Sequence, residues 1–479
     1  MTRLPLPTEQ WLGRAMESWL PGRRWFAGKG RAFSPPRIVH RVTFPHPGGD
    51  PGSDGSAAAW RAELLVVRVH HTQVEAPDHY LVPIGTRTVL PAHLGPYLIA
   101  RHGDCAVYDA LADPEIARRM ALDLLTGRIG HPQLTVRGGG PGTALPAAGT
   151  ARLLPGEQSN TSLVVDETVL VKVFRRLRTG ENPESELLRL LTTAGAAGVP
   201  ELLATLDGPL AGGRATYAVA QRYLPDAAGG WDLALADAEV VARTDGATAG
   251  GLAAEARRMG RTVAGVHRAL ADAAPRTRLT GQDLRETGAG MRGRLAAAAR
   301  AVPRVADLAP RIAAAYQALE HTAGGVPAQR LHGDLHLGQM LRTAAGWSVI
   351  DFEGEPDRTL TERRRLQPVA KDVAGVLRSF DYAAHHLLLL QQAPGGRAGP
   401  DTRRILHEWT TRSQRAFCAG YAEAAGSDPR DHRDLLRAYL MDKAVYELLY
   451  EIGNRPRWAA IPLRALEHLA RDPSALPGR

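Results

Sequence analysis

The 479-residue sequence contains few of the features that define several protein classes. It has only two cysteines, Cys105 and Cys418, far apart and in no CxxC or Cys/His ligand spacing. We therefore expect neither a disulfide framework nor a zinc site. No window approaches eighteen uninterrupted apolar residues, and the N-terminus lacks an apolar core followed by a small-residue cleavage site. These absences predict a cytoplasmic protein with no membrane partner.

Lysine is also scarce. Only four of the 59 basic residues are lysine, namely Lys29, Lys172, Lys371 and Lys443. The net charge is +9, but the arginines are spread among acidic residues and few aromatic residues lie between them. This pattern favours an arginine-rich composition over a nucleic-acid surface, so no nucleic-acid partner is expected. A lysine in such a chain indicates a site that needs a compact point charge.

The length exceeds that of one compact core and predicts two or three subdomains. With 44% hydrophobic and 23% charged residues, the chain is typical of soluble globular proteins. Segments 60–71 and 79–85 have the apolar pattern of strands, and 113–127 begins and ends as a helix does, so the first 150 residues are mixed α/β. Periodic Ala/Leu/Arg windows such as 251–273 and 404–426 predict helices after Gly229. Pro/Gly-rich linkers are expected at residues 45–59 and 137–149.

One stretch, from Arg330 to Pro356, concentrates acidic and amide groups. Asp334 follows His-Gly, Gln339 comes five positions later, and Asp351 follows an apolar run. The small residues at 343–346 predict a hairpin turn, which would bring Asp351 back beside Gln339 and Asp334. Carboxylate and amide oxygens suit Mg²⁺. The aspartate that does not hold metal could then orient a hydroxyl group.

A second piece of chemistry lies upstream, in residues 156–177. This segment predicts a strand, a turn and a second strand that carries Lys172 between valines, with a loop of small residues leading in. A lysine in a buried strand needs an anionic partner, and the helix predicted next carries Glu184 and Glu186 in its first turn. Such a loop, lysine and glutamate form the phosphate-binding half of a protein-kinase-like site. Residues 218–224 would form the hinge.

Each of these signals alone is weak. A strand lysine is more often a snorkelling edge residue, and His-Gly-Asp recurs in unrelated chains. Their order, however, is that of a kinase: small-residue loop, lysine, helix glutamate, hinge, HGD, side-chain amide and then DFE.

With these motifs, the chain resembles the actinobacterial maltokinases, relatives of the aminoglycoside phosphotransferases within the eukaryotic-like kinase superfamily. The resemblance covers nearly the whole length, and glucosamine kinases belong to the same branch. The HGD and DFE elements are shared with many small-molecule kinases, whereas the first and last stretches are specific to the maltokinase-like branch. The matching stretches are "WLPGRRWFAGKGR", "SNTSLVVDETVLVKVFRRL", "HGDLHLGQML", "IDFEGEP", "KDVAGVLRSFDYAA" and "DKAVYELLYEIGNRPRWAAIPL".

The resemblance implies an α+β fold, bilobal and protein-kinase-like. An N-terminal cap subdomain would span residues 1–100, the rest of the N-lobe 101–222, and a mostly helical C-lobe 223–479. ATP and Mg²⁺ are the implied cofactors, and a trehalose synthase is an implied partner.

Roles follow from the resemblance residue by residue. Asp334 matches the catalytic base, Asp351 the metal-bridging aspartate, and Gln339 a metal-side amide that is usually asparagine. Lys172 matches the phosphate-binding lysine with Glu186 as its helix partner and Glu184 as the alternative. The remaining nucleotide-site residues come from the small-residue loop and the hinge: Ser159, Asn160, Thr161, Gln221 and Tyr223.

The sugar site is expected near the C-terminus, where polar and aromatic side chains recur at helical spacing. The alternative interpretation is a solvated salt-bridged stripe with its tyrosines in the core. His336 could contact phosphate, although a hydrogen bond that holds the loop is favoured, and a structural role is favoured for Glu353 and Glu355. The candidate substrate residues are His336, Lys443, Tyr446, Glu447, Tyr450 and Glu451.

The predicted reaction transfers the γ-phosphoryl group of ATP to the anomeric hydroxyl of maltose, giving maltose 1-phosphate for glycogen or α-glucan synthesis. Glucosamine kinase is the first alternative. An aminoglycoside-type antibiotic phosphotransferase is the second, and the long N-terminal extension argues against it. A pseudokinase scaffold is the last, because Lys172, Asp334 and Asp351 are all present.

Overall fold

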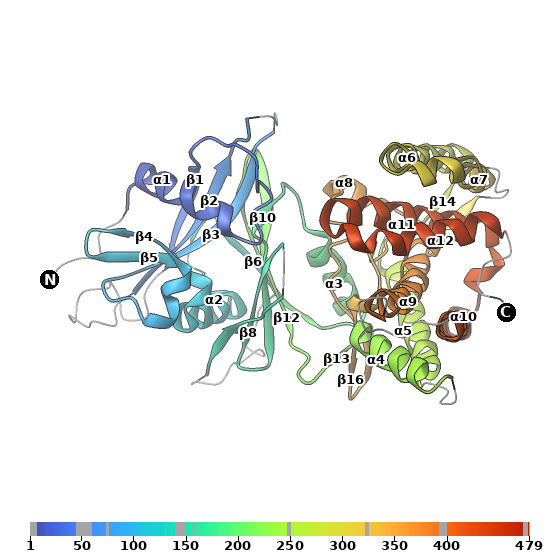
Figure 1. The fold of residues 1–479 in the computed structure, drawn as a ribbon. Helices are drawn as coiled ribbons and strands as arrows, with labels where there is room; N and C mark the ends of the chain where they lie inside the picture. The colour runs from blue at the N-terminus through green and yellow to red at the C-terminus, as the bar shows by residue number, and fades with distance from the viewer. Residues whose placement is uncertain are drawn as a thin grey trace. The chain divides into compact units, whose positions relative to one another are not determined.

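The computed structural model describes residues 7–44, 60–72, 76–129, 131–138, 149–156, 159–246, 251–320, 325–391, 400–472 and 478. The chain divides into two compact units (Figure 1). The first comprises Met1–Glu186 and Glu201–Pro225, and the second Leu187–Pro200 and Asp226–Arg479. The division falls within helix α3 (Pro183–Thr193), whose first turn belongs to the first unit.

The first unit contains two antiparallel sheets. Strand order in one is β1-β2-β3-β5-β4, with β10 also paired to β3. Helix α1 (Glu9–Trp19) packs on this sheet because Leu12, Met16 and Trp19 recur on one face and bury against Leu65 and Val67. The strands are β1 (Arg37–Phe44), β2 (Trp60–Val69), β3 (Asp78–Arg87), β4 (Leu98–His102), β5 (Cys105–Asp109) and β10 (Arg176–Leu177).

The other sheet of this unit has the order β6-β11-β12-β9-β8-β7. Central β9 pairs with both β8 and β12, which places Lys172 opposite Ser162 on one side and Val219 on the other. The β8–β9 turn needs positive φ at Asp166 and Glu167, and acidic residues tolerate that region better than branched ones. The strands are β6 (Thr135–Gly138), β7 (Ala151–Leu153), β8 (Thr161–Val165), β9 (Val169–Val173), β11 (Leu202–Leu210) and β12 (Gly213–Arg222).

Helix α2 (Pro114–Thr126) confirms the helix predicted at 113–127. Asp113 caps its start by accepting a hydrogen bond from the Glu115 amide, and proline occupies its first turn. Gly127 ends the helix at a φ of 68°, in the left-handed region that glycine adopts most easily. The predicted strands at 60–71 and 79–85 are likewise confirmed, as β2 and β3.

The second unit is mostly helical (Figure 1). Helices α5 and α10 pack along each other, and α11 packs against α6, α7, α9 and α12. The helices predicted at 251–273 and 404–426 are confirmed within α5 and α10. The helices are α4 (Gly230–Arg243), α5 (Leu252–Ala273), α6 (Gly281–Ala301), α7 (Pro303–Glu320), α8 (Leu360–Arg363), α9 (Ala370–Gln391), α10 (Pro400–Ala425), α11 (Arg433–Asn454) and α12 (Ala460–Arg471).

Short strands complete the second unit. Strand β14 (Thr277–Leu279) pairs with β15 (Val326–Ala328), and β13 (Ala228–Gly229) extends a hairpin of β16 (Met340–Thr343) and β17 (Gly346–Val349). In that hairpin Met340 faces Val349 and Thr343 faces Gly346. The hairpin predicted around 343–346 is therefore confirmed.

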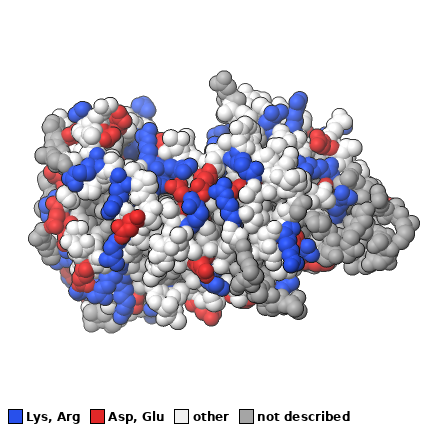
Figure 2. All heavy atoms as spheres, turned by 180° about the vertical axis from the view of Figure 1, so that it is seen from behind, with Lys and Arg blue, Asp and Glu red and all other residues white. Residues whose placement is uncertain are grey.

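Of the expected linkers, 45–59 lies outside the described residues, as do 139–148 of the second one. Among the described helices, none has the length and apolarity needed to cross a bilayer. Figure 2 shows one face of the molecule, on which Lys and Arg are spread widely with Asp and Glu among them.

Candidate active site

The loop that carries Asp334 is held in place by a buried carboxylate, Asp372, near the start of α9. Its two oxygens accept hydrogen bonds from the amides of His332 and Gly333, each at 2.9 Å. The ring of His267 lies 3.1 Å from the same side chain. Burial raises the pKa of Asp372, but the His267 hydrogen bond and the backbone donors outweigh burial and hold it below its usual value. This charged anchor fixes the loop backbone from which Asp334 projects.

Asp334 pairs with a lysine 109 residues further along the chain. Lys443, on α11, donates to Asp334 Oδ1 at 2.7 Å. Burial raises the pKa of Asp334, but the Lys443 ammonium, with smaller help from His336 and His332, holds it well below its usual range. The reverse effect raises the pKa of Lys443 despite its burial. Asp334 therefore stays a carboxylate at neutral pH, able to accept a hydrogen bond.

The hairpin brings Asp351 to Gln339, as the sequence predicts. Gln339 Nε2 donates to Asp351 Oδ2 at 2.8 Å, and the Ile350 amide donates to the Gln339 carbonyl at 3.0 Å. Asp351 adopts a φ of 65°, a left-handed conformation that costs free energy for a non-glycine residue. Such strain at a polar site fits a residue held for chemistry.

The donor set beside the hairpin suits a hard cation. Asp351 offers carboxylate oxygens, and a half-turn of the Gln339 amide would replace its nitrogen with an oxygen. The amide nitrogen, and not the expected oxygen, faces Asp351, because a donor satisfies a carboxylate directly. Mg²⁺ would thus be held by Asp351 and Gln339.

A cavity of about 380 Å³ opens beside Asp334 in the second unit, and we call it the Asp334 pocket. Lys443, Glu447 and Glu451 line it from one face of α11, one turn apart. They do not form a solvated stripe, because each pairs with a group outside α11 or at its end. Glu447 accepts from Arg378 at 2.7 Å, and Glu451 is buried and accepts from Arg455 and from the Tyr382 hydroxyl.

Aromatic rings form the other part of the wall. Tyr446 lies under the Lys443 ammonium, which is 5.0 Å from its ring centre. Arg455 lies 5.7 Å from the Tyr450 ring centre and 4.3 Å from that of Trp458. His336 also lines the pocket, and its Nδ1 accepts from the Gly338 amide at 3.0 Å, the loop-holding bond favoured from the sequence. All six candidate substrate residues therefore line one pocket.

In the first unit, Lys172 pairs with Glu184, the alternative that the sequence offered to Glu186. The Lys172 Nζ to Glu184 Oε2 distance is 2.8 Å, and the two side chains are 7% and 1% exposed. Asn182 caps α3 by accepting a hydrogen bond from the Glu184 amide at 2.8 Å. Both glutamates fit the sequence pattern, and only the phase of the helix separates them.

The other predicted nucleotide-site residues lie in the same unit. Ser159 is exposed and Asn160 is buried in the loop before β8. The Thr161 hydroxyl accepts from Arg175 at 2.8 Å, and Tyr223 donates its amide to the Thr168 carbonyl. Gln221 is buried, and its side-chain oxygen has no hydrogen-bond partner among the described residues. A buried amide oxygen of this kind fits a ligand that brings its own donor.

Family models match both parts of the sequence. The maltokinase N-terminal cap domain matches residues 19–113, and the phosphotransferase enzyme family matches residues 150–435. The chain belongs to the phosphotransferase enzyme family. As a phosphotransferase it is a kinase, and it carries the cap domain of the maltokinases.

Two curated relatives of this phosphotransferase are glucosamine kinases. That of Streptacidiphilus jiangxiensis is 32% identical over 327 residues, which cover 65% of this chain and 72% of the relative. That of Mycolicibacterium smegmatis is 29% identical over 324 residues, which cover 65% and 78%.

A solved glucosamine kinase in complex with glucosamine, ADP and inorganic phosphate matches with a TM-score of 0.66 at 24% identity, covering 97% of this chain and 99% of that chain. A second form of the enzyme matches with a TM-score of 0.64, also at 24% identity, covering 91% and 92%. At this identity the likeness shows the fold, which is the kinase-like fold with an N-terminal cap domain.

Sequence reasoning about this phosphotransferase missed several residues that build the site. Asp372, Arg378 and Tyr382 lie in a stretch that was quoted only for its resemblance, and Trp231 was not singled out. A buried acid early in a long apolar helix is a usable signal for Asp372, since such a group needs fixed partners. No comparable signal marks Trp231, whose place in the wall depends on helix packing.

Proposed function

We propose that the protein is an ATP-dependent sugar kinase that phosphorylates the anomeric hydroxyl of maltose and produces maltose 1-phosphate. The observation that carries this proposal is the placement of Asp334 and its partner Lys443 in the wall of a pocket of about 380 Å³ lined by charged pairs and aromatic rings. That volume lies in the range of small-molecule sites.

Asp334 would accept the hydrogen bond of the sugar hydroxyl. With its pKa held low by Lys443, it is a weak base, so it orients the hydroxyl oxygen toward the γ-phosphorus and takes the proton late. As the new P–O bond forms, the bond to the ADP oxygen breaks. Phosphoryl transfer passes through a loose transition state, so positioning and charge stabilisation account for most of the rate.

The remaining roles fall to residues whose geometry suits them. Lys172, fixed by Glu184, would bind the ATP phosphates, and the unpartnered oxygen of Gln221 would accept a donor from the nucleotide. Asp351 and Gln339 would hold Mg²⁺, which offsets negative charge on the phosphates.

Charge balance in the Asp334 pocket favours a neutral acceptor. Asp334, Glu447 and Glu451 are paired with Lys443, Arg378 and Arg455, respectively. The paired groups still have lone pairs and N–H groups that can bond to sugar hydroxyls. The pocket wall carries no uncompensated negative charge from these three carboxylates. Aromatic faces beside them suit the apolar faces of pyranose rings. A neutral disaccharide such as maltose meets both requirements.

Glucosamine is the second candidate acceptor. Both curated relatives described above are glucosamine kinases, and a paired carboxylate such as Glu447 can still accept a hydrogen bond from an ammonium group. The two sugars differ in charge and size, so one experiment separates them.

The test is ADP release with maltose, glucose and glucosamine as acceptors, with Asp334→Asn as the matched inactive control. NMR of the product then identifies the phosphorylated position. We expect the highest kcat/KM with maltose and phosphorylation at the anomeric carbon. A higher kcat/KM with glucosamine would replace maltose by the second candidate. ADP release no faster than in the control, with all three sugars, would contradict the sugar kinase itself.

Several parts of the sequence-based hypothesis stay predictions. They are the supply of α-glucan synthesis, a trehalose synthase partner, the cytoplasmic location and the division into residues 1–100, 101–222 and 223–479. Co-purification of the full chain with a trehalose synthase would test the partner.

A further inference from the structure

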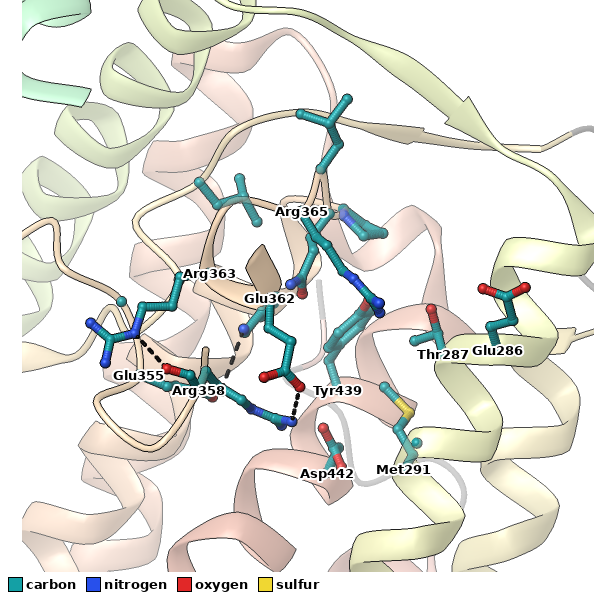
Figure 3. Close-up of a pocket in the computed structure, with 18 of the residues that line it drawn as sticks. Glu286, Thr287, Met291, Glu355, Arg358, Glu362, Arg363, Arg365, Tyr439 and Asp442 are labelled. Atoms are coloured by element: carbon teal, nitrogen blue, oxygen red, sulfur yellow. Dashed lines mark hydrogen bonds and ion pairs between the residues drawn. The ribbon is translucent and has the colours of Figure 1, made fainter. Parts of the chain in front are cut away.

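A second cavity lies in the helical unit, and the chemistry above does not use it. It has a volume of about 460 Å³ and is bounded by α6, by α11 and by residues 354–368, and we call it the α6–α11 cavity (Figure 3). Its wall includes Gly333 and Gly354 but not Asp334, Gln339 or Asp351. The cavity therefore reaches the backbone next to the catalytic residues without containing them.

Tyr439 on α11 places a hydroxyl in this cavity without a hydrogen-bond partner among the described residues. The side chain is otherwise buried, with the residue only 5% exposed. Burial raises the pKa of Tyr439 well above its usual value, so at neutral pH the group is a hydrogen-bond donor. Buried tyrosine hydroxyls normally have partners. A partner for this one must come from the cavity.

Basic groups stand near the same hydroxyl. Arg365 extends into the cavity on the side that carries Tyr439 (Figure 3), and it forms no ion pair with any described residue. Lys371, one of the four lysines, lies in the wall with its Nζ 3.7 Å from Glu355. These donors differ from Arg358, which is committed to Glu355 and Glu362. Together they provide an end suited to a phosphate group.

The opposite wall, on α6, is acidic and hydroxylated. Glu286 and Thr287 face the cavity there (Figure 3). Glu286 is exposed and receives only a 3.3 Å bond from Gln282. Carboxylate and hydroxyl acceptors suit the hydroxyl groups of a sugar. We propose that the α6–α11 cavity is a second ligand site that binds a phosphorylated sugar, with its phosphate on Tyr439, Arg365 and Lys371 and its hydroxyls toward α6.

Occupation of this site has a direct route to the catalytic loop. Glu355 lines the α6–α11 cavity and also the narrow space that contains Asp334 and Lys443. A phosphate bound by Lys371 would draw its ammonium from Glu355, whose pKa lies below its usual value through Lys371 and Lys443 although burial raises it. This step rests on the proposed function: a sugar kinase produces a phosphorylated sugar, which is the class of ligand that this site would bind. The product would then inhibit the kinase that forms it.

The test measures binding before it measures rate. Calorimetry measures the binding of maltose 1-phosphate, glucosamine 6-phosphate and inorganic phosphate to the full chain. Maltose and glucosamine are present at saturating concentration, so that the Asp334 pocket is already filled. The test variant carries two changes, Tyr439→Phe and Arg365→Ala. The first keeps the buried ring and removes only the hydroxyl, and the second removes an exposed arginine. Arg285→Ala, an exposed change on α6 outside the cavity wall, is the control.

We expect one sugar phosphate to bind under these conditions, with a Kd at least about tenfold weaker in the double variant and unchanged in the control, since a bond to a charged group is lost. Initial rates without product should be equal in all three proteins. Three results would each overturn the proposal. They are equal Kd values in the double variant and the parent, no binding of a sugar phosphate while the acceptor sugar is saturating, and inorganic phosphate that binds as tightly as both sugar phosphates. Binding by a protein that phosphorylates no sugar would refute the proposed function and leave this site standing.

Discussion

Each unit of the molecule contains a lysine–carboxylate pair of nearly equal length, formed in opposite ways. In the first unit Lys172 and Glu184 are 2.8 Å apart and 12 residues apart in sequence. In the second, Lys443 and Asp334 are 2.7 Å apart and 109 residues apart. A strand and the next helix make the first pair, whereas the second joins a loop to a helix near the C-terminus. Local sequence can thus narrow the first pair to two neighbouring glutamates, whereas it gives no indication of the second pair.

The two pairs also differ in their access to ligands. The side chains of Lys172 and Glu184 are 7% and 1% exposed, while those of Lys443 and Asp334 are 15% and 20% exposed. A fully buried pair fixes the position of its lysine, and breaking it leaves an uncompensated charge. The more exposed pair stands in a pocket wall, where an incoming hydroxyl can reach the carboxylate. Under the proposed function, the first pair would position its lysine and the second would take part in the reaction.

The largest expected effect is that of Asp334→Asn. The amide keeps the shape of the side chain but cannot take the hydroxyl proton, so kcat should fall by at least about a thousandfold, within the range of general base catalysis. Nucleotide binding should change little. Rates from ADP release and a nucleotide Kd measured by calorimetry check this, and retention of most of the turnover would remove Asp334 from the reacting pair.

Removal of its partner should be the next largest effect. Lys443→Met should lower kcat/KM by roughly ten- to a hundredfold, because a charged hydrogen bond is lost. It should also raise the pKa of Asp334, since only the weaker effects of His336 and His332 then oppose the rise that burial causes. A rate that requires the carboxylate falls as pH drops through that pKa. The acid limb of the pH profile should therefore move upward, to about pH 4 or above.

Lys443→Arg is the matched control for that shift. It retains a positive charge, so the acid limb should stay low even if the rate falls because the fork fits the site poorly. An identical limb in the Met and Arg variants would show that Lys443 is not what holds the pKa of Asp334 down.

The buried pair predicts a smaller and more specific effect. Glu184→Gln should lower kcat/KM for ATP by about tenfold and reduce Tm, because Lys172 loses its carboxylate in a buried site. Glu186→Gln is the matched control, because it makes the same change two positions further along α3. It should leave kcat/KM for ATP and Tm nearly unchanged. Thermal unfolding with steady-state kinetics over ATP measures both. Equal losses in the two variants would mean that both glutamates support Lys172.

The smallest expected effect lies in the Asp334 pocket. Glu447→Gln keeps size and one acceptor but leaves Arg378 less well compensated, which should cost about 1–3 kcal/mol in sugar binding without changing KM for ATP. Neutral maltose should tolerate it better than cationic glucosamine. The measurement is kcat/KM for both sugars, and equal small losses would contradict a role for Glu447 in the choice of sugar.

The sequence alone predicted much of the fold and the local half of the site. Alternation and caps predicted β2, β3 and α2, because side-chain alternation and helix capping depend on residues close together in sequence. The four small residues at 343–346 were enough to predict the hairpin that brings Gln339 to Asp351. The preference for Glu186 over Glu184 has the same origin, since the sequence does not fix which face of α3 meets the strand that carries Lys172.

Only the tertiary structure decided the rest, because burial in a helical unit depends on packing between segments far apart in sequence. Spacing placed Lys443, Glu447 and Glu451 on one face of α11, but their partners lie on other elements or beyond the helix end. Thus the sequence determined which side chains are candidates for the chemistry, and packing determined that Lys443 pairs with Asp334. It also left the Tyr439 hydroxyl facing a cavity, since a hydroxyl on α11 can find a partner only where another segment supplies one.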